Sequence, residues 1–183
     1  NPQPSNSDSG FLPKGGIQYN ITDDKMVYAL RSEGFRTGGI NRSRGNPTLP
    51  FAYDSDTLIN YEAGAKTQWM DGRLQINITG YHQIWKDYQL EVTDPSFNFG
   101  EVFQTVVTNV GDAVIDGVDF DITAVPAAGV EVGLSGTYLF RNETKDAFTV
   151  TDPRLPGAPA LSLPAGSRLP LVADLNLAGY AQY

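Results

Sequence analysis

Apolar and polar residues alternate through the stretch from Thr57 to Glu91. Its first half places Ile59, Tyr61, Ala63, Ala65, Thr67 and Trp69 on one side, and Asn60, Glu62, Gly64, Lys66 and Gln68 on the other. Its second half places Leu74, Ile76, Ile78, Gly80, His82 and Ile84 opposite Arg73, Gln75, Asn77, Thr79, Tyr81, Gln83, Trp85 and Asp87. A period of two predicts strands with one apolar and one polar face. Asp71-Gly72 between the halves supplies the positive φ angles of a two-residue hairpin turn.

These two strands are unusually long. They run roughly 13 and 19 residues, whereas strands of soluble proteins usually have about 5–6. Long strands with dyad alternation and a tight turn at one end are typical of a transmembrane barrel.

Five further strands are predicted, at about 15–21, 25–36, 103–125, 130–140 and 171–183. In the strand at 25–36 we expect Met26, Tyr28 and Leu30 to point outward. The strand at 103–125 is interrupted at Asn109-Val110-Gly111-Asp112, which we interpret as a bulge or kink.

The connections alternate in length. Short turns are expected at about 22–24, 70–72 and 126–129, and long loops at 37–56, 92–102 and 142–170. In an outer-membrane barrel the short turns face the periplasm and the long loops face outside. A soluble sandwich has no reason to segregate loop lengths so regularly.

The alternation also predicts which residues face lipid. The lipid-facing set is Ala63, Ala65, Ile76, Ile78, Phe120, Ile122, Val132, Leu134, Leu175 and Leu177. The set facing the barrel lumen is Asn60, Glu62, Lys66, Gln75, Asn77, Asp119, Asp121, Glu131 and Asp174.

Composition changes this picture little. A mean hydropathy of −0.27 alone suits a soluble protein, but only every second residue of a membrane strand meets lipid. No run of about 18 apolar residues is present, so no transmembrane helix is predicted. The net charge of −8 argues against nucleic acid as a partner.

Several blocks resemble one family. These are Tyr61-Glu62-x-Gly64-x-Lys66 with Trp69-x-Asp71-Gly72-Arg73-Leu74, then Tyr81 with Trp85-Lys86-Asp87-Tyr88, together with Asn109-Val110-Gly111-Asp112-Ala113-x-Ile115-x-Gly117-Val118-Asp119 and Ser32-Glu33-Gly34-Phe35-Arg36-Thr37-Gly38-Gly39. In this order and spacing they are similar to the barrel of TonB-dependent outer-membrane receptors. The resemblance covers about residues 11–183.

The resemblance implies an all-β fold, an antiparallel transmembrane β-barrel segment of about seven long strands from a 22-stranded barrel. Because bacterial single-chain barrels have even strand numbers and bilayers do not tolerate open edges, further strands are expected on both sides. Residues 1–183 are therefore expected to be part of one barrel domain, with the plug domain and remaining strands elsewhere in a longer protein.

The resemblance further implies a receptor in the bacterial outer membrane that takes up a ferric-siderophore-like ligand and is energised through TonB. Haem, cobalamin and glycans are other ligands of the family. Expected partners are outer-membrane lipid, lipopolysaccharide, the iron chelate, the plug domain and TonB. Two alternatives stay open: a passive porin, which a plug domain would exclude, and a soluble or surface-anchored β-sandwich binding module, which would not need detergent for extraction.

Candidate chemistry is sparse. One histidine, His82, without cysteine, is a poor metal site, and no nucleophile–base set appears, so neither a metal, a cofactor nor an enzyme is predicted. Asp116, Asp119 and Asp121 are interpreted as a solvated polar face rather than a calcium site.

The expected ligand contacts lie in the first long loop. Arg42 and Arg44 offer charge and fixed donors to an anionic chelate, and Tyr53 offers a rigid ring with a polar tip. Other basic residues lie at or in the long loops: Arg36, Arg141, Lys145, Arg154 and Arg168.

Overall fold

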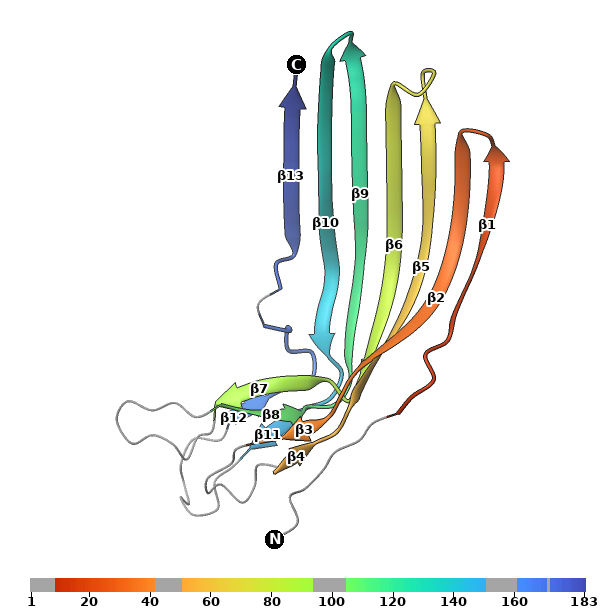
Figure 1. Ribbon diagram of the computed structural model, residues 1–183. Helices are drawn as coiled ribbons and strands as arrows, with labels where there is room; N and C mark the ends of the chain where they lie inside the picture. Colours follow the sequence, from red (N-terminus) through yellow and green to blue (C-terminus); the bar gives the residue numbers. More distant parts are fainter. Residues whose placement is uncertain (1–8, 42–50, 94–104, 151–160, 171) are drawn as a thin grey trace.

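The computed structural model describes residues 9–41, 51–93, 105–150, 161–170 and 172–183. Its main element is a seven-stranded antiparallel sheet in the order β1-β2-β5-β6-β9-β10-β13 (Figure 1). The strands are β1 (Lys14–Thr22), β2 (Lys25–Arg36), β5 (Asp56–Trp69), β6 (Leu74–Lys86), β9 (Ala113–Ala127), β10 (Val130–Thr144) and β13 (Leu175–Gln182). Among the described residues, no helix is long and apolar enough to cross a membrane.

Three short hairpins lie at one end of this sheet. They are β3 (Gly39–Ile40) with β4 (Ala52–Tyr53), β7 (Gln89–Thr93) with β8 (Thr105–Asn109), and β11 (Phe148–Val150) with β12 (Leu161–Leu163). The strand ends that lead into the long connections lie at this end, called the loop end, and the short turns lie at the other, called the turn end (Figure 1). The predicted segregation of loop lengths is thus present.

A turn forms at Asp71-Gly72, but the loop is longer than the two residues expected: β5 ends at Trp69, β6 begins at Leu74, and Met70 also has φ 57°. Asp71 has φ 57° and Gly72 has φ 81°, and the Arg73 amide donates to the Met70 carbonyl at 3.2 Å. Positive φ at both central positions is the type I′ requirement. The Arg73 guanidinium then donates to the carbonyls of Val125 and Pro126, so this hairpin is tied to the next one.

Strand pairing confirms that the two predicted residue sets lie on opposite faces. Residues directly opposite in an antiparallel pair share a face. Ala65 pairs with Ile78, Ile78 with Phe120, Ile122 with Leu134, and Gly136 with Leu177, which defines the apolar face. Lys66 pairs with Asn77, Asn77 with Asp121, and Glu131 with Gln182, which defines the polar face. Asp174, expected on the polar face, precedes β13.

The predicted facing of β2 is wrong. Met26, Tyr28 and Leu30 pair with Lys66, Gly64 and Glu62, so they lie on the polar face, and Val27 and Ala29 lie on the apolar face. The reason is tertiary: the Tyr28 ring lies over Gly64, where a Cβ atom would collide with it. Its hydroxyl is 2.7 Å from Thr79 Oγ1.

Two predicted strands are also divided. The strand expected to reach Glu91 ends at Lys86, and Asp87 has φ 53°. The strand expected at 103–125 is β8 followed by β9, and Gly111 at the break has φ 90°. The interruption at 109–112 is therefore a junction at which the chain leaves the sheet, not a bulge.

The remaining boundaries differ less. β10 extends to Thr144, and its pairing with β9 has register shifts between Val130 and Val132 and between Leu139 and Arg141. The last strand begins at Leu175 rather than at 171. Buried apolar side chains gather at the loop end, where the hairpins fold against the sheet: Val92, Val106, Val110, Ala113, Val114, Leu139 and Leu169.

Candidate functional site

A buried ion pair anchors the loop end. Asp56 is 1% exposed and accepts hydrogen bonds from the Arg36 guanidinium and, at 3.0 Å, from the Gln89 amide. The Arg36 guanidinium carbon also lies 4.7 Å from the Trp85 ring centre and 5.3 Å from that of Tyr88. Burial raises the pKa of the Tyr88 phenol, and the neighbouring Arg36 opposes that rise. This arrangement, the loop-end clamp of Arg36, Asp56, Trp85, Tyr88 and Gln89, joins β2, β5 and the β6–β7 junction.

The motif at 109–112 supplies a second set of ties. Asn109 Nδ2 donates to the carbonyls of Asp54 at 3.1 Å and Asp87 at 2.7 Å, and its Oδ1 accepts from the Asp54 amide at 2.9 Å. Asp112 forms an ion pair with Lys86. The Tyr88 amide donates to the Gly111 carbonyl at 2.8 Å, so both breaks lie side by side.

The first hairpin is bound to the second. Asn41 donates from Nδ2 to the Val107 carbonyl at 2.6 Å and accepts from the Val107 amide at 2.9 Å. These bonds place β3 and β4 against β8. The first two hairpins therefore form a connected platform at the loop end.

The structure describes only one of the three predicted ligand residues. Arg42 and Arg44 lie outside the described residues. Tyr53 is in β4, opposite Gly39, and its ring covers Gly39 so closely that a Cβ there would collide with it. Tyr53 is half-buried, so part of its surface remains available.

Most of the other basic residues named from the sequence are engaged. Arg36 is in the clamp, Arg141 pairs with Asp116 and Arg168 pairs with Asp174. Arg154 lies outside the described residues. Arg36, Arg141 and Arg168 are each partly neutralised by a carboxylate, and a basic patch at Arg42 and Arg44 stays a prediction.

The three aspartates do not form one cluster. Asp116 pairs with His82 on the apolar side of the sheet, whereas Asp119 and Asp121 pair with Thr79 and Asn77 on the polar face. In the described part of the chain, no group of three potential ligands is arranged to hold a metal ion. Asp119 accepts from Thr137 Oγ1 at 2.6 Å, as a polar wall residue would.

Sequence reasoning missed the clamp because its members lie far apart in the chain. Arg36 ends one predicted strand, Asp56 is the last residue of the predicted loop at 37–56, and Gln89 lies inside another predicted strand. One signal was available: a carboxylate and a guanidinium at facing ends of two adjacent antiparallel strands. Pairing them required the register, in which Arg36 is opposite Asp56.

Comparisons with known proteins agree with this architecture. The family model described as "TonB dependent receptor-like, beta-barrel" matches residues 1–183. The pesticin receptor of Yersinia pestis is 28% identical over 174 residues, covering 94% of this chain and 24% of that protein. The ferric-pyoverdine 358 receptor of Pseudomonas putida is 29% identical over 127 residues, covering 69% of this chain and 13% of that protein.

Two solved structures share the fold. The ferric yersiniabactin uptake receptor FyuA of Yersinia pestis has a TM-score of 0.66 at 20% identity, covering 93% of this chain and 22% of that one. The ferripyoverdine receptor of Pseudomonas aeruginosa, bound to ferripyoverdine, has a TM-score of 0.58 at 19% identity, covering 95% and 20%. The chain thus spans about a quarter or less of the length of these relatives.

Proposed function

The chain belongs to the TonB-dependent receptor β-barrel family, and from this premise we propose that it forms part of the wall and loops of a receptor for a ferric-siderophore-like chelate. The family places the chain in the outer membrane of a Gram-negative bacterium. It also makes the chain part of a transport receptor rather than an enzyme. The proposal includes one barrel domain that contains residues 1–183. Further strands would complete this barrel to 22, and a plug domain would fill it.

One observation carries it. A single sheet has an apolar face, a polar face and all its long connections at one end (Figure 1). An apolar face suits lipid, a polar face suits a lumen or plug, and a platform of bonded hairpins suits the capture of a ligand from outside. We propose that 37–56, 92–102 and 142–170 are extracellular and that Asp71-Gly72 is periplasmic.

Siderophore uptake is favoured over other cargoes by the relatives. A pesticin receptor, a ferric-pyoverdine receptor and a ferric yersiniabactin uptake receptor are among the proteins to which the chain is similar. Two of these names, ferric-pyoverdine and ferric yersiniabactin, contain an iron chelate. TonB would supply the energy, as the family name implies.

Within this chain, Arg42, Arg44 and Tyr53 are the proposed ligand contacts. Arginine binds carboxylate and similar anionic groups through paired N–H donors. Since Arg36, Arg141 and Arg168 are engaged in ion pairs, Arg42 and Arg44 would supply the local positive charge. Tyr53 would add the exposed part of a ring that Gly39 holds in place.

The test uses the complete receptor and a panel of ferric siderophores. Radiolabelled iron uptake into iron-starved cells should require the receptor, TonB and the proton gradient. Uptake that persists without TonB would point instead to a passive porin. A receptor that takes up haem or cobalamin but no ferric siderophore would overturn the ligand class.

Residue roles need a separate measurement. Replacing Arg42 and Arg44 together with Ala should weaken chelate binding roughly tenfold at low salt, the effect of about 1.4 kcal/mol. The loss should shrink as salt rises, because exposed charges are screened. Arg73→Ala, at the turn end, is the matched control and should leave affinity unchanged. Full affinity in the double variant at low salt would remove both residues from the site.

A further inference from the structure

Two asparagine side chains hold the two ends of the first long loop, 37–56. Asn41, directly after β3, donates from Nδ2 to the Val107 carbonyl at 2.6 Å and accepts from the Val107 amide through Oδ1 at 2.9 Å. Asn109, in β8, donates from Nδ2 to the Asp54 carbonyl at 3.1 Å and accepts from the Asp54 amide through Oδ1 at 2.9 Å. Each carboxamide thus bonds both backbone groups of one residue in the other hairpin. We call these two pairings the asparagine staples.

Gln89 of the loop-end clamp adds a third tie between the same loop ends. Its Nε2 donates to the Thr37 carbonyl at 3.1 Å and to the Asp54 carbonyl at 2.8 Å. Asn109 Nδ2 also donates to the Asp87 carbonyl at 2.7 Å, which joins its staple to the junction after β6. Side chains from β7 and β8 therefore hold the start and the end of the loop in one position relative to the sheet.

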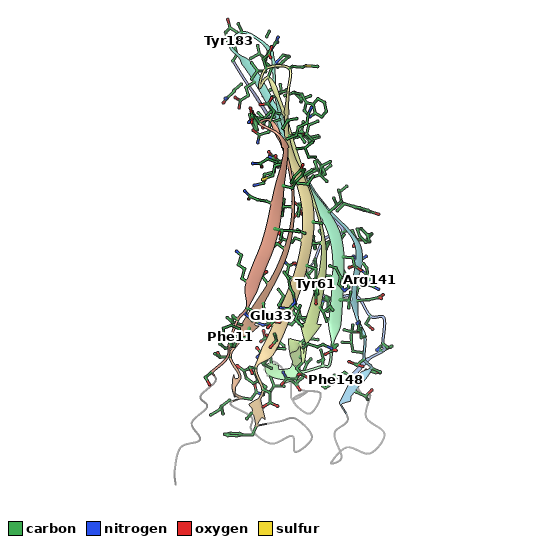
Figure 2. All side chains as sticks on the ribbon, turned by 90° about the vertical axis from the view of Figure 1, so that its right-hand side faces the viewer. Phe11, Glu33, Tyr61, Arg141, Phe148 and Tyr183 are labelled. Carbon is green, nitrogen blue, oxygen red and sulfur yellow. The ribbon has the colours of Figure 1, made fainter. Side chains whose placement is uncertain are left out.

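β8 is a fixed base for both staples. Val106, Thr108 and, directly after the strand, Val110 are buried. Phe148 of β11 packs against the apolar cluster that contains Val106, and Figure 2 shows Phe148 at the loop end of the sheet. By alternation, the Asn109 side chain lies on the opposite side of β8 from these buried residues. One side of β8 is thus anchored by packing, and the staples connect this anchored strand to the first hairpin.

The β3–β4 hairpin has little pairing of its own. Its ladder consists of two residue pairs, Gly39 with Tyr53 and Ile40 with Ala52. Even a longer two-stranded hairpin is only marginally stable in water when nothing packs against it. The position of this hairpin therefore depends on the bonds that join it to its neighbours, which are the staples and the tie from Gln89.

Tyr53 is the proposed ligand contact that these bonds place. Its ring lies against Gly39 of the same hairpin, so Gly39 determines how the ring is turned within the hairpin. The residue after Tyr53 is Asp54, whose amide and carbonyl are both bonded to Asn109. Loss of the Asn109 side chain would leave the ring on Gly39 but would let β4 move as a whole.

We propose that Asn41 and Asn109 are positioning residues for ligand binding, which act by fixing both ends of the first long loop and with them Tyr53. This inference rests on the proposed function, in which Tyr53 contacts the chelate. Asparagine suits the task, because one carboxamide offers an acceptor and donors that match the N–H and C=O of a single backbone residue. A loop that is already in place loses less conformational entropy when the ligand binds.

The test measures the affinity of the complete receptor for a ferric hydroxamate, a ferric catecholate and a ferric phenolate chelate by isothermal titration. Asn109→Ala and Asn41→Ala should each weaken binding about fivefold, the result if the competent loop position falls to about a fifth of the molecules. Asn77→Ala is the matched control, because its amide donates to Asp121 on the polar face, and it should leave affinity unchanged.

A double-mutant cycle separates positioning from general destabilisation. In a Tyr53→Ala receptor, Asn109→Ala should weaken binding by less than about twofold, because both changes act through the same contact. A general loss of stability would instead add its full effect in that background. Unchanged affinity in both asparagine variants, or full additivity with Tyr53→Ala, would overturn the positioning role.

A second measurement needs no ligand. Amide exchange in the complete receptor should be about tenfold faster at Asp54 in Asn109→Ala and at Val107 in Asn41→Ala, and unchanged at both amides in Asn77→Ala. Unchanged exchange in the first two variants would overturn the staples, and faster exchange with full chelate affinity would overturn the positioning role alone. If no ferric chelate binds the unchanged receptor, the proposed function fails and the positioning role fails with it, whereas the exchange rates still report whether the staples hold the loop.

Discussion

Phe120 is the position at which the proposed membrane orientation is tested most directly. It lies on the apolar face, opposite Ile78 on one side and Gly136 on the other. Phe120→Arg would place a charge in the middle of the apolar band. An arginine introduced on the polar face of the same strand would lie among polar side chains. The comparison therefore changes the surroundings of the arginine and not the residue that is introduced.

The magnitude follows from the position along β9. Phe120 is four residue steps from Asp116, which is opposite His82, and four from Ala124, which lies in the row of Leu74 and Trp69. Four steps are about 13 Å along the strand and about 10 Å along the membrane normal. Phe120 is therefore near the midplane, where an arginine on the lipid face costs about 2–4 kcal/mol.

The assay is equilibrium unfolding of the complete receptor in lipid vesicles, read as the change in the free energy of unfolding. Thr123→Arg is the matched control, because Thr123 is on the polar face of the same strand and opposite Gln75. Its effect should stay within about 0.5 kcal/mol. A cost at Thr123 as large as that at Phe120, or no cost at Phe120, would refute the facing of the sheet.

Three further outcomes are expected. Cysteines at Ser43 and Ser162 should react with an impermeant reagent on whole cells and one at Asp71 should not; labelling at Asp71 alone would reverse the topology. Asp56→Ala should lower the free energy of unfolding by about 2–3 kcal/mol. This is below the roughly 3–5 kcal/mol of a fully buried pair, because the arginine partner is partly exposed. The substitution should also speed amide exchange in β7 and β8, and unchanged exchange there would show that the ion pair does not anchor the hairpin. Gly72→Ala should cost about 1–2 kcal/mol in the same unfolding assay, because φ is 81° there, and no cost would contradict the type I′ turn.

Much of the fold was predictable because local chemistry decides it. Alternation in β5 and β6 determines which residues share a face, and Asp71-Gly72 determines where the chain turns. Seven long strands, alternate short and long connections and the antiparallel order all follow from such local patterns. The family blocks are explained in the same terms: Gly64 makes room for the Tyr28 ring, and Arg73 bonds to the end of β9.

Other features depend on register between strands, which no local pattern specifies. Met26, Tyr28 and Leu30 are apolar, yet β2 turns them to the polar face because Tyr28 packs over Gly64 and bonds to Thr79. β6 ends at Lys86 and β9 begins at Ala113, although alternation alone would have continued both strands. The two breaks are bonded to each other, since the Asp87 amide donates to Asp112 and the Tyr88 amide to the Gly111 carbonyl.

Charged residues show the same difference between what the sequence determines and what the structure decides. The sequence by itself determined that this chain has a two-faced sheet with charged residues near its strand ends. Only the tertiary structure decided that Arg36 meets Asp56 and that Arg31, His82 and Arg141 lie in one row, since these residues come from different strands. An ion pair needs its charges within about 4 Å, and that distance is set by how the strands align.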